Sequence, residues 1–145
     1  MPTTARKAAE ELGNLGWLLE RFLTVTREAR WAVLASRDGV TRCFAGLPRD
    51  YADPIGALAS GLHSLGMSAP GPLGTTATGE VRQAVIEHDD YLLFVMGAGH
   101  GSLLAVRARP GADAGVIGHE MGQLVRRVGE HLTTPDRTAE GSPAS

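Results

Sequence analysis

Several features that mark common classes of protein are scarce or missing in this sequence. Cys43 is the single cysteine among 145 residues, so no internal disulfide can form, and a reducing compartment is favoured. Residues 1–11 are small and polar and lack the apolar run of a secretory signal. No stretch approaches the roughly 20 apolar residues that a membrane helix requires. We therefore expect a cytoplasmic protein that does not insert into a membrane.

The charge balance lacks the excess that nucleic acid binding requires. Fourteen basic residues stand against 16 acidic ones, and all but Lys7 of the basic residues are arginines scattered along the chain. Affinity for a phosphate backbone depends on clustered positive charge, so we expect no nucleic acid partner. Hydrophobic residues (43%) and charged residues (21%) occur at ordinary globular proportions, which makes one packed core feasible.

The length is that of one domain. Segments 1–9 and 133–145 hold small and polar residues with almost nothing to bury, and this composition predicts disordered tails. The folded domain is then expected over 10–132.

Hydrophobic periodicity and turn residues predict the order α-β-β-α-β-β-β-α. Asp38-Gly39 between two apolar runs indicates a hairpin, and Asp53-Pro54 is typical of a helix start. Strands joined by short turns are antiparallel neighbours, so the fold class is α+β, with a five-stranded antiparallel sheet flanked by helices. The expected helices span 10–28, 53–66 and 113–132, and the expected strands 31–36, 41–46, 79–87, 91–96 and 102–109.

The second expected helix has two different faces. Ile55, Leu58, Leu62 and Leu65 recur at helical spacing and predict the side that packs on the sheet. The other side carries only small residues, where a partner helix could approach closely. Glycine inside an exposed helix costs about 1 kcal/mol relative to alanine, which favours an interface over a solvated surface. These small residues are Ala57, Ser60, Gly61 and Ser64.

Motifs for catalysis or metal binding are incomplete. His119-Glu120 resembles the start of a zinc-protease motif, but Gln123 stands where the second histidine is required. The glycine-rich segment 97–101 has no lysine and leads into a strand, which indicates a hairpin turn instead of a phosphate loop. The five histidines show no metal-ligand spacing. We therefore expect no catalytic residue, no cofactor and no metal.

Taken together, the residues and their order resemble the Roadblock/dynein light chain family. The resemblance covers about 12–132 and is carried by four segments. These are Leu15-Gly-Trp-Leu-Leu19, Val33-Leu-Ala-Ser-Arg-Asp-Gly-Val40, Ala52-Asp-Pro-Ile-Gly-Ala-Leu-Ala59 and Gly118-His-Glu-Met-Gly-Gln-Leu-Val125. More narrowly, the chain is similar to bacterial members that are encoded beside a Ras-like GTPase and a sensor kinase in operons called conservons.

The resemblance implies a five-stranded antiparallel sheet with profilin-like layers and a homodimer formed through the second helix and the third strand. It also implies a non-catalytic adaptor or regulator of a Ras-like small GTPase, within a complex that can include the sensor kinase. The family relative in gliding bacteria stimulates its GTPase without supplying a catalytic arginine. Whether this chain activates, inhibits or only scaffolds stays open. The expected interface residues are Ala57, Ser60, Gly61, Ser64, Val81, Gln83 and Val85, the last three predicted on one face of the third strand.

Two other functions remain open at this point. One is a small-molecule sensor, in which the long loop after Met67 covers a pocket beside the sheet. The other is a hydrolase that uses Ser36 or Cys43, although neither has a candidate base nearby. A copurified ligand would favour the sensor, and a neighbouring GTPase gene would favour the adaptor.

Overall fold

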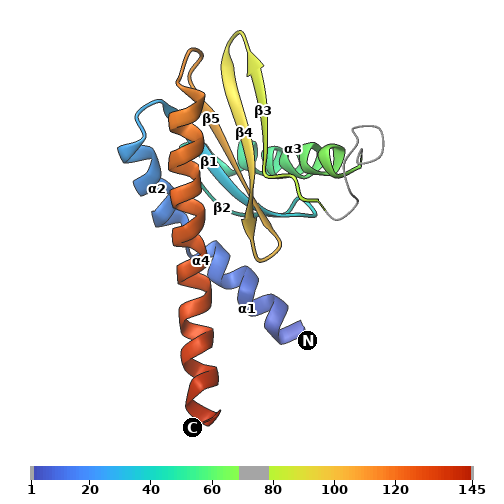
Figure 1. The fold of residues 1–145 in the computed structure, drawn as a ribbon, viewed down its shortest axis with the longest axis vertical. Helices are drawn as coiled ribbons and strands as arrows, with labels where there is room; N and C mark the ends of the chain where they lie inside the picture. Colours follow the sequence, from blue (N-terminus) through green and yellow to red (C-terminus); the bar gives the residue numbers. More distant parts are fainter. Residues whose placement is uncertain (1, 69–78, 145) are drawn as a thin grey trace.

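The computed structural model describes residues 2–68 and 79–144, in which helices cover both faces of one sheet (Figure 1). The strands occur in the spatial order β2-β1-β5-β4-β3, and every neighbouring pair is antiparallel. The α+β class and the five-stranded antiparallel sheet are confirmed. The elements are α1 (Pro2–Gly13), α2 (Gly16–Val25), β1 (Ala29–Ser36), β2 (Thr41–Ala45), α3 (Arg49–Met67), β3 (Gln83–His88), β4 (Tyr91–Gly99), β5 (Ser102–Ala108) and α4 (Ala114–Ala144).

The two faces of the sheet carry unequal cover. In Figure 1, α4 crosses in front of the sheet, with α2 beside it, and α3 lies behind. The front core is large and joins the leucines of α1 and α2 to alternate residues of the strands and the apolar face of α4. The core under α3 is much smaller. Its fully buried members are Val33, Ala52, Ala59, Val95, Leu103 and Ala105.

Helix boundaries differ from the sequence expectation at several points. The single helix expected over 10–28 is two helices, because the chain turns at Asn14 and Leu15 between glycines. The helix α1 begins at Pro2, and the helix α4 extends to Ala144, so helix occupies segments that the composition predicts as disordered tails. For α1, alanine, arginine, lysine and glutamate supply high helix propensity.

The start of α3 is also earlier than predicted. The helix begins at Arg49, after Pro48, so Pro54 lies inside it and is not its first residue. A proline near a helix N-terminus removes one backbone hydrogen bond, which the packing of the rest of the helix can offset. The strand β3 is shorter than predicted, beginning at Gln83 and not at Gly79.

Close packing of α3 on the hairpin generates a first prediction. A Cβ on Gly56 would lie 2.6 Å from Thr41 Oγ1 and 2.9 Å from the carbonyl oxygen of Gly39. We expect Gly56→Ala to lower the free energy of unfolding by about 1–3 kcal/mol, because the helix must move away from the sheet. Gly122→Ala in α4 is the matched control: its Cβ would meet nothing within 4 Å, so stability should rise by about 1 kcal/mol. Urea unfolding measures both, and equal effects would contradict the packing.

Candidate functional site

Several large apolar side chains of α3 are exposed to solvent. Tyr51, Leu58 and Leu65 are 67%, 44% and 69% exposed, and they recur at seven-residue intervals along one side of the helix. The half-buried Ile55 and Leu62 lie between them. Residues at such alternating three- and four-residue spacing form a continuous stripe, as in helices that pair with other helices. We call these five residues the α3 stripe.

The prediction that Leu58 and Leu65 pack in the core is therefore wrong. The side of α3 that is buried against the sheet carries Ala52, Gly56, Ala59 and His63. The small side chains at Ala52, Gly56 and Ala59 let the helix backbone approach β1 and β2, and this close approach directs the bulky residues to the flank. Periodicity alone cannot distinguish two adjacent faces when both recur at helical spacing.

The predicted small-residue face divides into two parts. Ala57, Gly61 and Ser64 line an open groove on α3 together with Leu58, Leu62, Leu65 and Ser68. A Cβ on Gly61 would meet nothing within 4 Å. Ser60 points elsewhere, because its hydroxyl donates a 2.6 Å hydrogen bond to the carbonyl oxygen of Arg37 in the hairpin.

Of the three residues predicted on one face of the third strand, Gln83 and Val85 share a face and Val81 lies before the strand. Val81 precedes β3 and contacts α3, since a Cβ on Gly66 would lie 2.6 Å from Val81 Cγ2. Gln83 lies on the opposite side of the sheet, 3.2 Å from where a Cβ on Gly118 of α4 would be. Val85, two residues further along β3, lies on the same face as Gln83 and is exposed. The strand β3 is nonetheless a sheet edge, as an interface strand would be.

A cavity of about 230 Å³ lies beside the α3 stripe, where α3 leaves the sheet uncovered. Trp31, Tyr91 and Leu93 of the strands face Ile55 and Leu58 of the helix across it. Arg107 closes one side, with its guanidinium 5.7 Å over the Tyr91 ring and its Nη2 donating to the carbonyl oxygen of Asp90 at 3.2 Å. Sequence reasoning missed this cavity, because Trp31, Tyr91 and Arg107 come from three separate strands.

The side chains that could serve as nucleophiles, bases or metal ligands do not gather at one place in the described residues. Burial raises the pKa of the Cys43 thiol to about 12, so the thiol stays protonated at physiological pH. The Ser36 hydroxyl donates to the Asp38 carboxylate within the hairpin turn and lowers the pKa of that carboxyl below its usual value. Cys43 is therefore a poor nucleophile, and the Asp38 carboxylate beside Ser36 is a weak base because its pKa is lowered. Within residues 2–68 and 79–144, no three histidine, cysteine or acidic residues gather where they could hold a metal ion.

The loop proposed to cover a sensor pocket falls mostly at 69–78, outside the described residues. Across the part of the chain that the structure describes, no helix has the length and apolar character to span a membrane.

Comparison with known proteins identifies related sequences and folds. The Roadblock/LC7 domain family matches residues 15–108. No curated protein is significantly similar to the chain in sequence. Among solved structures, the Roadblock/LC7 domain from Streptomyces avermitilis is 47% identical, with a TM-score of 0.76 over 83% of this chain and 98% of that chain.

The likeness to gliding proteins lies in the fold. The gliding protein MglB from Thermus thermophilus is 21% identical, with a TM-score of 0.66 over 86% of this chain and 91% of that chain. An MglB structure with a tetrameric arrangement is also 21% identical, with a TM-score of 0.67 over 86% and 90%.

The burial of Cys43 predicts that its thiol reacts slowly in the folded chain. At pH 8, we expect the native thiol to react with Ellman's reagent at least about 1,000-fold more slowly than in urea, because only the thiolate attacks and its pKa is about 12 in the folded chain. The absorbance of the released thiolate dye measures both rates. Fast labelling of the native protein would show that Cys43 is accessible and would revive the hydrolase hypothesis.

Proposed function

Because the chain belongs to the Roadblock/LC7 domain family, we propose that it is a non-catalytic, dimeric adaptor that binds a Ras-like small GTPase. The observation that carries this proposal is the α3 stripe. A helix that is apolar on an exposed flank has not buried all of the surface that stabilises it, and such patches mark protein interaction sites. A second copy of the chain would cover the stripe.

The small residues beside the stripe support a helical partner. Ala57, Gly61 and Ser64 leave the backbone of α3 open, so a second α3 could pack close to it. The interlocking of large and small side chains is how paired helices reach the density of a protein interior.

The free edge of β3 supports the same dimer. Exposed edge strands present unpaired N–H and C=O groups, which pair readily with another strand. The strand β3 lies at the sheet edge, and α3 contacts it on the face of the sheet where the 230 Å³ cavity lies. Strand pairing and helix pairing could therefore occur together in one symmetric contact.

The proposed GTPase partner rests on the resemblance to conservon-type members of the family. The fold likeness to MglB agrees with this class, and a tetrameric arrangement is known for that protein. In this proposal the chain binds the GTPase and does not itself hydrolyse the nucleotide.

The stripe predicts how dimerisation can be broken. We expect the unaltered chain to be a dimer at micromolar concentration by light scattering, above the 15.2 kDa of one copy. Gly61→Leu would hold the partner helix away and cost roughly 1–3 kcal/mol per site, and about 1.4 kcal/mol weakens the dimer tenfold. Leu65→Lys would place a charge in the contact. Both variants should keep their far-UV circular dichroism, because both positions are open.

The matched control for these variants is Trp17→Lys, which changes an exposed apolar side chain on α2, on the opposite side of the sheet. This variant should remain dimeric. If Gly61→Leu and Leu65→Lys are also dimeric with unchanged affinity, the stripe is not the interface.

A further prediction concerns binding to the GTPase. We expect the chain to bind the Ras-like GTPase of its own operon in calorimetry, and Leu65→Lys to weaken binding at least tenfold if the GTPase contacts both subunits. The purified chain alone should show no GTP turnover in a phosphate-release assay. Turnover by the chain alone, or no binding by the unaltered chain, would contradict the proposal.

A further inference from the structure

The 230 Å³ cavity beside the α3 stripe is lined by aromatic and aliphatic side chains and by one cation. Leu93 is buried there, whereas Trp31 and Tyr91 are half-buried and Leu58 is exposed, so the cavity is reachable from solvent. Every lining residue belongs to one chain. The cavity can therefore be complete without a partner.

The cation of this cavity, Arg107, has no carboxylate partner. No ion pair joins it to an acidic residue in the part of the chain that the structure describes. Asp90 contributes only its backbone carbonyl oxygen, which accepts a 3.2 Å hydrogen bond from Nη2. The carboxylate of Asp90 lies 3.8 Å from His88 Nδ1 and is 81% exposed. The lining therefore carries one positive charge that no acidic residue balances.

Part of the Arg107 guanidinium remains available to a ligand. Its Nη1 makes no hydrogen bond within the described residues and, unlike Nε, is not buried. The guanidinium carbon lies 5.7 Å from the centroid of the Tyr91 ring, which attracts the cation but does not neutralise it. A carboxylate would do so, because its hydrogen bonds to an ionised donor are short and strong.

The volume of the cavity sets the size of its ligand. An engineered cavity of about 150 Å³ holds benzene. A volume of about 230 Å³ thus leaves room for one aromatic ring with a short arm. Aromatic pairs gain energy in offset-stacked or edge-to-face contacts, which Trp31 and Tyr91 can supply, and Ile55 and Leu58 add aliphatic surface.

The charge and the walls together select the kind of acid. A carboxylate carries one negative charge, as one guanidinium requires, whereas a phosphate monoester carries about 1.5 to 2 at neutral pH. An acidic side chain of a partner protein would supply the charge without a ring, and a phenylalanine would supply a ring without the charge. A free aromatic acid supplies both in one molecule.

We propose that this cavity binds a small aromatic carboxylate, in which one ring is joined to the acid by a short arm. The ring packs against Trp31, Tyr91 and Leu58, and the carboxylate accepts a hydrogen bond from Arg107 Nη1. Binding needs neither a second copy of the chain nor the GTPase. The site is thus an addition to the proposed adaptor function and does not rest on it.

The test uses the full chain, labelled at the δ1 methyl groups of its three isoleucines and titrated with phenylacetate in an NMR experiment. Ile55 lines the cavity, and the fully buried Ile117, in the core on the opposite face of the sheet, is the internal control. We expect a saturable shift of the Ile55 signal through the ring current of the ligand, with a Kd on the order of 1 mM or below. The Ile117 signal should not move.

Two related compounds separate the contributions of the charge and of the ring. Phenylacetamide keeps the shape of phenylacetate without its charge, and acetate keeps the charge without the ring. Each should bind at least about fivefold more weakly than phenylacetate. Because the protein is unaltered in this comparison, a folding defect cannot produce the difference.

Three variants complete the test. Arg107→Gln should weaken phenylacetate binding at least about fivefold and leave phenylacetamide binding unchanged. Arg42→Gln is the matched control and should bind normally, since Arg42 is also a half-buried strand residue with an unpartnered Nε but does not line the cavity. Leu65→Lys, which should break the proposed dimer, should bind phenylacetate as the unaltered chain does. The site and the dimer can therefore fail separately.

Several outcomes would overturn the proposal. They are an Ile55 signal that does not shift, equal affinities for phenylacetate and phenylacetamide, or unaltered phenylacetate binding by Arg107→Gln. Binding by Leu65→Lys but not by the unaltered chain would assign the cavity to a side chain of the second copy instead.

Discussion

A single helix has to cover one whole face of a five-stranded sheet. The helix α3 meets this constraint by approaching β1 and β2 closely through Ala52, Gly56 and Ala59, where larger side chains would hold it away. Its bulky residues are then displaced to the flank and leave part of the sheet beside Tyr91 and Leu93 uncovered. The exposed apolar stripe is thus a consequence of how one chain packs α3 on its own sheet.

The fold was largely predictable because its signals are local. The hairpin follows from Asp38-Gly39, where Gly39 adopts a φ of 94° that other residues rarely take, and the remaining strands follow from apolar runs between turn residues. Antiparallel pairing then fixes most of the sheet. Element ends were less predictable, since Pro54 marks a helix start in sequence but lies within α3.

The candidate site was predictable only in part, because it depends on which side of a helix meets the sheet. Leucine periodicity assigns Leu58 and Leu65 to the core, yet alanine and glycine occupy that position. Gly61 lies on the open side of the helix, where a Cβ would meet nothing within 4 Å, and Ala57 lines the same groove. The cavity lined by Arg107, Trp31 and Tyr91 forms only when their three strands pair, so the spacing of these residues in the sequence does not predict it.

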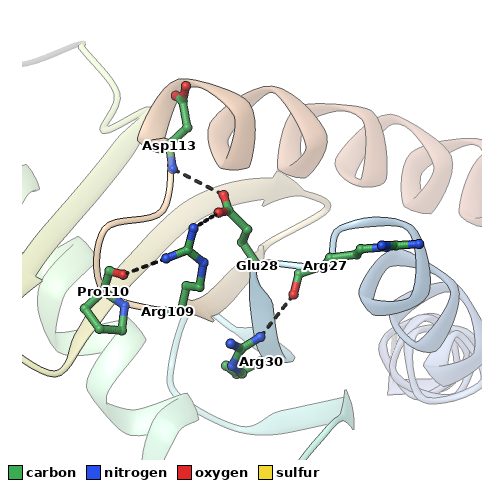
Figure 2. Close-up of polar contacts among 6 residues, drawn as sticks. All are labelled: Arg27, Glu28, Arg30, Arg109, Pro110 and Asp113. Atoms are coloured by element: carbon green, nitrogen blue, oxygen red, sulfur yellow. Dashed lines mark hydrogen bonds and ion pairs between the residues drawn. The ribbon is translucent and has the colours of Figure 1, made fainter.

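The ends of α2 and β5 and the start of α4 are held together on the face of the sheet opposite α3. Glu28, between α2 and β1, forms an ion pair with Arg109 and accepts a 3.3 Å hydrogen bond from the backbone N–H of Asp113 (Figure 2). These segments are far apart in the sequence, so the contacts fix the start of α4 against the end of α2. This face therefore closes over a large core within one chain, whereas the small core under α3 leaves the α3 stripe exposed.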